Sequence, residues 1–157
     1  AADFTIKGAV AFVEALNRAG IACALASGTD QADVRAEAEA LGYAHLFTGG
    51  IYGAVGDIAK DAKREVLERI MADIGTIRGR LVTFGDGPVE MRETRRRGGL
   101  PVGVASDEVR RFDLNPAKRS RLIRAGAALI IPDFTQAVAL LRVLHLEPAA
   151  SAPRARP

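Results

Sequence analysis

Residues 81–88 read Leu-Val-Thr-Phe-Gly-Asp-Gly-Pro, an apolar run followed by a glycine-rich acidic turn and a proline. The first four residues favour a short strand, and Pro88 suits the first turn of a helix, where its missing N–H costs nothing. Similar signals recur along the chain, so helices separate successive strands. Such strands pair in parallel through right-handed crossovers. The sequence therefore predicts an α/β fold with a three-layer, Rossmann-like parallel sheet, in which sites lie at the carboxyl ends of strands.

The other elements are predicted from apolar spacing and from the positions of glycine and proline. We expect helices over 8–19 and 61–74 and after Asp30, Pro88, Asn115 and Ile131, and strands over 21–25, 81–84, 101–105 and 128–131. The glycine-rich segment 48–56 is predicted to be an irregular connector. These elements predict one core domain over residues 1–147, followed by a flexible tail of Ala, Pro, Arg and Ser over 148–157.

Composition excludes several classes of protein. The chain has 157 residues, 48% of them hydrophobic, which is enough to bury a core without a metal or disulfide frame. Cys23 is the only cysteine, and His45 and His145 are isolated, so neither a disulfide nor a zinc site of paired Cys and His is expected. No apolar run approaches the ~20 residues of a membrane span, and the amino end lacks the pattern of a secretion signal. We therefore expect a cytoplasmic protein with no membrane partner.

The net charge of +3 is unevenly distributed, since residues 92–124 hold ten Lys or Arg against four Asp or Glu. Arg95-Arg96-Arg97 and Arg110-Arg111 could bind a phosphate-rich polymer. Aromatic residues for base stacking are missing nearby, which argues against nucleic acid as a partner. A non-catalytic module that binds phosphate or nucleic acid through this Arg-rich helix is kept as the alternative function. Gly50, Gly53 and Gly56 lack the spacing and the preceding strand of a dinucleotide-binding motif.

Two polar clusters precede the turn of residues 85–87. Ser27-Gly28-Thr29-Asp30 follows the first predicted strand, and it either caps the next helix or binds a phosphate oxygen through a hydroxyl and backbone N–H groups. Lys60 and Lys63 begin the helix over 61–74. Either they are solvated charges, or one of them reaches the strand ends and neutralises a phosphoryl group.

The turn itself carries a pair of acids. Glu90 follows Asp86 by four residues, so the two carboxylates can point toward one place at the end of a strand. Oxygen ligands of this kind suit Mg2+, which completes its octahedron with water and substrate phosphate. The alternatives are that Asp86 is a turn residue and that Glu90 complements the helix dipole.

Together, the segments Leu25–Thr29, Lys60–Val66 and Phe84–Met91 resemble the haloacid dehalogenase (HAD) superfamily of phosphohydrolases in their order and spacing. The resemblance covers residues 8–146, and the third segment is its most specific part. It implies a Mg2+-dependent hydrolase that acts on a small phosphorylated metabolite. It also implies roles for individual residues: Ser27, with Gly28 and Thr29, binds the phosphoryl group; Lys63, or Lys60 in its place, is the catalytic lysine; Asp86 and Glu90 hold Mg2+.

One motif of this superfamily is missing from the chain. Enzymes of this superfamily begin with an aspartate nucleophile in an Asp-x-Asp motif on the first strand, and they form an aspartyl-phosphate that water hydrolyses. The chain contains no Asp-x-Asp. That strand is the central one of the family's sheet, and without it the sheet would have a gap lined by unpaired backbone groups.

Two hypotheses account for the missing strand. In the first, the chain is part of a longer phosphatase whose first strand precedes Ala1. In the second, a short protein closes the gap by pairing the two neighbouring strands directly, by using Asp3–Ile6 as a strand, or by forming a homodimer. Such a protein would bind phosphate or Mg2+ without turnover.

Overall fold

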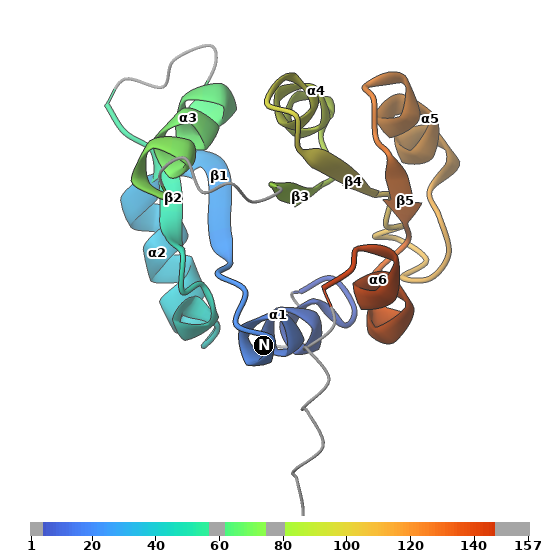
Figure 1. Ribbon diagram of the computed structural model, residues 1–157, viewed down its shortest axis with the longest axis horizontal. Coiled ribbons are helices and arrows are strands. Elements are labelled where there is room, and N and C mark those ends of the chain that lie inside the picture. Colours follow the sequence, from blue (N-terminus) through green and yellow to red (C-terminus); the bar gives the residue numbers. More distant parts are fainter. Residues whose placement is uncertain (1–4, 57–61, 75–80, 147–157) are drawn as a thin grey trace, which may run out of the picture.

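Parallel strands alternate with helices in the computed structural model, which describes residues 5–56, 62–74 and 81–146 (Figure 1). The strands are β1 (Ala24–Asp30), β2 (Gly50–Ala54), β3 (Val82–Gly85), β4 (Leu100–Val104) and β5 (Leu129–Ile131). The helices are α1 (Ala9–Arg18), α2 (Gln31–Ala40), the short 3-10 helix η1 (Ala44–Leu46), α3 (Ala62–Ile74), α4 (Pro88–Arg96), α5 (Pro116–Arg124) and α6 (Ala137–Val143). The α/β class predicted from the sequence is therefore confirmed. The predicted tail over 148–157 and Lys60 lie outside the described residues.

Strands β3, β4 and β5 form a parallel sheet that is covered on both faces. On one face, α1 and α6 pack against the sheet through Phe12, Leu140 and neighbouring apolar side chains. On the other face, α4 and α5 bury Met91 and Leu122. The ring of Phe12 lies 5.3 Å from that of Phe84 on β3, which fixes α1 to this sheet.

Strands β1 and β2 form a second parallel sheet. Helix α2 packs on it through Val34 and Ala38, which form a small core with Ile51. Helix α1 reaches this half as well, because the Asn17 amide donates a hydrogen bond to the backbone oxygen of Leu46 at 2.8 Å. Thus α1 contacts both sheets.

The two sheets are not joined by backbone pairing between β1 and β3 in the described part of the chain. Figure 1 shows β1 and β3 on either side of the centre of the molecule, with α1 close to both halves. All four residues of β3 are half-buried, whereas four of the five residues of β4 are fully buried. Direct pairing of the two strands is therefore wrong as a way of closing the gap. Thr5 and Ile6 belong to no strand, and Asp3 lies outside the described residues.

Strand β1 differs from its predicted position. It begins at Ala24 and continues to Asp30, so residues 27–29 lie within the strand rather than in a turn after it. Ala26 pairs with Tyr52 and Asp30 pairs with Ala54. Between these two pairs, β1 advances by four residues while β2 advances by two, which is a β-bulge in β1. This bulge carries the polar residues out of the regular ladder. Asp30 then caps α2 by accepting the N–H of Ala32 at 2.8 Å.

Strand β2 lies in the segment predicted to be a connector, and that prediction is wrong. A side chain at Gly53 would come within 2.5 Å of the Gln31 backbone and 2.6 Å of the Thr29 backbone oxygen. Only glycine allows β2 to approach the bulge of β1 so closely. The glycines that made the segment look irregular are thus part of the strand.

No helix within the described ranges has the length and apolar character needed to span a membrane.

Candidate active site at the ends of β1 and β3

The carboxyl ends of β1 and β3 are connected by one ion pair. Lys63, in the first turns of α3, donates from Nζ to Oε1 of Glu90 on α4 at 2.5 Å. The Glu90 side chain is 16% exposed and that of Lys63 is 42% exposed. A lysine and an acid that lie 27 residues apart in the sequence therefore meet between the two sheets.

Glycines at both strand ends leave room for this pair. A side chain at Gly28 would lie 3.2 Å from Cγ of Lys63, so the lysine lies directly over the end of β1. At the end of β3, a side chain at Gly87 would overlap Oε2 of Glu90. Lys63, Glu90 and Gly28, three of the residues predicted from the sequence, thus lie together.

Ser27 and Thr29 flank Gly28 in the bulge of β1. The Ser27 hydroxyl accepts a hydrogen bond from the backbone N–H of Thr29 at 3.2 Å. This contact is local and exposed, as expected for a short turn within a bulge. It places the hydroxyl and the N–H group beside one another, next to the glycine that Lys63 covers.

Asp86 has a different partner from Glu90. Its Oδ2 lies 3.8 Å from Nζ of Lys118 on α5, and its backbone oxygen accepts a hydrogen bond from Arg121 at 3.4 Å. The Asp86 side chain is 53% exposed. Sequence reasoning missed Lys118, because no motif marks a lysine 32 residues beyond the acidic turn.

Glu90 retains one unused oxygen. Its Oε2 is buried and has no hydrogen-bond partner among the residues that the structure describes, a state that is costly for a carboxylate. A cation or donor bound at this point would satisfy it, so the residue suits a Mg2+ ligand. The described residues contain no group of three or more His, Cys, Asp or Glu that could hold a metal ion. Asp86 and Glu90 would therefore need further oxygen ligands.

The arginines of the predicted Arg-rich helix make contacts within the chain. Arg97 pairs with Glu93 at 2.7 Å and is only 19% exposed, and Arg96 pairs with the same carboxylate at 2.7 Å. Arg95 donates to the backbone oxygen of Gly126 at 2.7 Å. Arg95 and Arg96 nevertheless remain exposed, with 68% of the Arg96 side chain open to solvent, whereas Arg97 is mostly buried.

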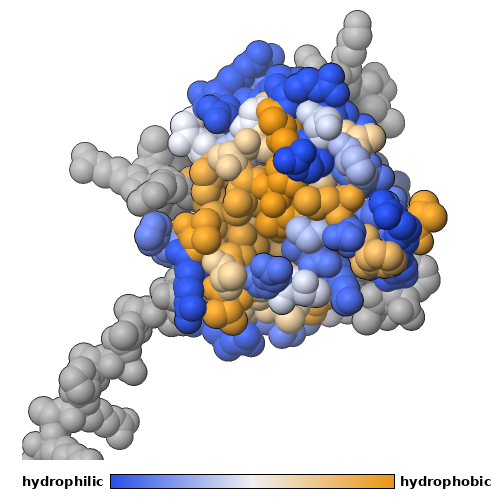
Figure 2. All heavy atoms as spheres, turned by 90° about the vertical axis from the view of Figure 1, so that its right-hand side faces the viewer, coloured by the Kyte–Doolittle hydropathy of each residue, from blue (hydrophilic) through white to orange (hydrophobic). Residues whose placement is uncertain are grey.

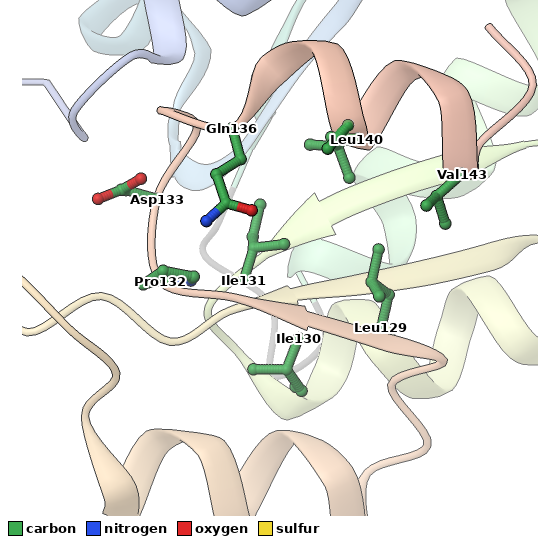
Figure 3. A pocket seen from close by; sticks show the side chains of 9 residues that line it. Leu129, Ile130, Ile131, Pro132, Asp133, Gln136, Leu140 and Val143 are labelled. Atoms are coloured by element: carbon green, nitrogen blue, oxygen red, sulfur yellow. The ribbon is translucent and has the colours of Figure 1, made fainter.

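An apolar pocket lies away from these residues, at the outer edge of β5. Figure 3 shows Leu129, Ile131 and Leu140 around it, and Pro132 and Gln136 also belong to its lining. Figure 2 shows the apolar surface on the same side of the molecule. The pocket contains none of the predicted site residues, so it is not the candidate active site.

One comparison with known proteins identifies a family. A family model described as haloacid dehalogenase-like hydrolase matches residues 1–98. A comparison with curated proteins gave no match.

Solved structures share the fold at low sequence identity. A HAD family hydrolase from Deinococcus radiodurans R1, crystallised with bound phosphate and sodium, has a TM-score of 0.73 and 21% identity over 92% of this chain and 62% of its own. A predicted phosphatase from Clostridium acetobutylicum has a TM-score of 0.69 and 17% identity over 86% and 59%. A conserved haloacid dehalogenase-like protein of unknown function from Agrobacterium tumefaciens has a TM-score of 0.69 and 21% identity over 89% and 61%. The chain thus spans about three fifths of the length of these structures.

Proposed function

The chain belongs to the haloacid dehalogenase-like hydrolase family, and from this membership we propose that it forms most of the catalytic core of a Mg2+-dependent phosphomonoesterase. Its substrate is a small phosphorylated metabolite, and its location is the cytoplasm. Neighbours in fold described as a predicted phosphatase and as a hydrolase with bound phosphate support the reaction class.

The Lys63–Glu90 pair between the ends of β1 and β3 is the observation that carries this proposal. An ammonium group held at that point offsets the negative charge of a phosphoryl group in the transition state. The Ser27 hydroxyl and the N–H groups of Gly28 and Thr29 bind its oxygens. These groups lie beside Lys63, because Lys63 covers Gly28.

Asp86 and Glu90 would hold the metal ion. The unused buried oxygen of Glu90 and the half-exposed carboxylate of Asp86 support this assignment. Mg2+ takes few protein carboxylates and fills its remaining positions with water and phosphate oxygens. When bound, the ion offsets charge on the phosphoryl oxygens.

We further propose that a strand encoded before Ala1 lies between β1 and β3 and carries an Asp-x-Asp motif. Within the described residues, β1 and β3 each have one edge without a strand partner, and β3 is half-buried. Both observations support this proposal. The aspartate carboxylate on that strand attacks phosphorus, the ester P–O bond breaks, and the leaving oxygen takes a proton. Water then attacks the aspartyl-phosphate, which releases inorganic phosphate and restores the carboxylate.

The experiment extends the chain by the residues encoded before Ala1 and measures hydrolysis of p-nitrophenyl phosphate with and without Mg2+. We expect Mg2+-dependent turnover by the extended chain and none by the 157-residue chain. Asp86→Asn should lower the rate at least about 100-fold. Asp33→Asn, a change of the same kind on α2, is the matched control and should retain the rate.

Two results would contradict the proposal. One is an upstream reading frame without Asp-x-Asp. The other is steady hydrolysis by the 157-residue chain that Asp86→Asn abolishes, since it would show that no further strand is needed. Binding of polyanions that weakens steeply with salt and ignores Mg2+, without hydrolysis, would instead favour the Arg-rich binding module.

A further inference from the structure

Lys118 lies between two carboxylates and is closer to the one outside the candidate site. Its Nζ is 2.5 Å from Oε1 of Glu108 and 3.8 Å from Oδ2 of Asp86. The Lys118 side chain is only 18% exposed, whereas Asp86 is 53% and Glu108 74% exposed. The Lys118 side chain is therefore mostly buried near the site, while both of its acidic neighbours remain open to water.

The backbone around Lys118 is fixed by a helix cap. Lys118 lies in the first turn of α5, and its N–H donates to the Asn115 side chain at 3.0 Å. Asn115 in turn donates its own N–H to the backbone oxygen of Ala105, which follows β4, at 2.8 Å. The start of α5 is thus tied to the end of the neighbouring strand.

Glu108 is also held in place, although its side chain is exposed. It lies in the loop between β4 and α5, which a bridge between Ser106 and Leu114 closes at its base. Asp107, next to Glu108, accepts the backbone N–H groups of Val109 and Arg110 at 3.1 and 2.9 Å. The loop therefore presents the Glu108 carboxylate at a defined distance from Lys118.

We propose that Glu108 holds the Lys118 ammonium away from Asp86 and so keeps the Asp86 carboxylate available to a divalent cation. The inference rests on the proposed function, in which Asp86 is a metal ligand. An ammonium group that moved onto Asp86 would occupy its oxygens and repel the incoming cation. Lys118 is thus a positioning residue whose place is set by Glu108.

A simpler explanation makes a different prediction. If Glu108 only adds negative charge near the site, its removal should weaken cation binding equally whether or not Lys118 is present. If Glu108 acts through Lys118, its removal should matter only while Lys118 is there. A double-mutant cycle separates the two cases.

The test measures Mn2+ binding to the full chain by electron paramagnetic resonance of the free ion. Lys118→Met should tighten binding about 3–10-fold, and Glu108→Gln should weaken it by a similar factor. In the Lys118→Met background, Glu108→Gln should change the dissociation constant less than about twofold. Arg119→Met removes the same charge from the next position of α5 and should have little effect.

The remaining outcomes distinguish a failure of this inference from a failure of the proposed metal site. Equal weakening by Glu108→Gln in both backgrounds, or equal effects of Lys118→Met and Arg119→Met, would overturn the inference. If either of these results occurred while Asp86→Asn still abolished Mn2+ binding, the inference would be wrong but the proposed metal site would remain supported. Unchanged binding in Asp86→Asn would contradict the metal site itself. Absence of Mn2+ binding in every variant would contradict the proposed metal site and, with it, the inference that rests on that site.

Discussion

At the scale of single residues, the Lys63–Glu90 pair is the contact on which the candidate site depends. Glu90 is mostly buried, and one of its oxygens has no partner within the described ranges, so Lys63 is the group that stabilises its charge there. Lys63 is more exposed, so water can solvate its charge if Glu90 is removed, whereas the buried Glu90 carboxylate needs Lys63 as a partner. This asymmetry leads to a prediction about stability.

Replacing Lys63 by Met should lower the free energy of unfolding by about 1–3 kcal/mol at neutral pH, because it leaves a mostly buried carboxylate without a partner. Glu90→Gln should cost less than about 1 kcal/mol, because the freed lysine can reach water. The double variant should resemble Glu90→Gln. Thermal unfolding followed by far-UV circular dichroism measures all three, and costs that simply add would contradict this account.

The residues of the site were predictable to different degrees. Asp86 and Glu90 share a turn and a helix start, and Ser27 and Gly28 follow an apolar run, so local pattern was enough to select them. Lys118 was not predictable, because its relation to Asp86 depends on how α5 packs beside the end of β3. A lysine in a helix resembles any solvated charge until that packing is known.

At the scale of elements, helix ends were easier to predict than strands. Helix α1 begins after Gly8, whose backbone has a left-handed conformation. Helix α5 begins at Pro116, directly after the capping residue Asn115. Strand β2 has only five residues, two of them glycine, and its identity depends on pairing with β1. Pairing between distant segments leaves little local signal, which is why β2 was missed and β1 was placed too early.

Helices α3 and α4 are connected by a second charged group besides the Lys63–Glu90 pair. Glu93 is buried on α4 and pairs with Arg96 and Arg97, and Arg97 also reaches Glu68 on α3 at 3.5 Å. Hydrogen bonding from Arg97, with the charges of the nearby arginines, holds the pKa of Glu93 below its usual value of 4.5. The contact therefore stabilises the folded chain only while Glu93 is ionised.

We expect Glu93→Gln to cost about 1–3 kcal/mol at neutral pH, as for a hydrogen bond to a charged group. Because the folded-state pKa is lowered, this cost should be complete above the unfolded value of 4.5 and should disappear as the pH falls through the folded value. Thermal midpoints of the two proteins between pH 7 and pH 3 measure it.

Glu68→Gln is the matched control, because it removes a carboxylate of the same network that is 51% exposed. Its cost should be under about 1 kcal/mol at neutral pH. A Glu93→Gln difference that stayed constant with pH would show that packing, rather than charge, makes this residue matter.

At the scale of the whole molecule, the two sheets have unequal support. The sheet of β3, β4 and β5 has three strands, whereas β1 and β2 form a two-stranded sheet, which depends on packing against α2 and α3 for its stability. No backbone hydrogen bond joins the two within the described ranges. The halves therefore depend on side-chain contacts of α1, α3 and α4 for their cooperation.

We expect the urea unfolding transitions of the 157-residue chain, followed by tyrosine fluorescence and by far-UV circular dichroism, to have different midpoints. The chain has no Trp, and Tyr43 and Tyr52 both lie in the half that contains β1 and β2. Tyrosine fluorescence should change at lower urea than far-UV circular dichroism, which reports on both halves. In the chain extended upstream of Ala1, the two transitions should coincide. Coincident transitions in the shorter chain would show that the helices alone couple the two sheets.

β1 and β3 each have one unpaired edge in the described part of the chain, which bears on the order of events during protein synthesis. β1 ends at Asp30 and β3 begins at Val82, so about 50 residues separate the two neighbours that an inserted strand requires. Ribosomes add roughly 5–20 residues per second, so such a strand would pair with β1 about 3–10 s before β3 is translated. During that interval the nascent chain would expose the strand's second edge, a time at which a chaperone or another nascent chain could bind it.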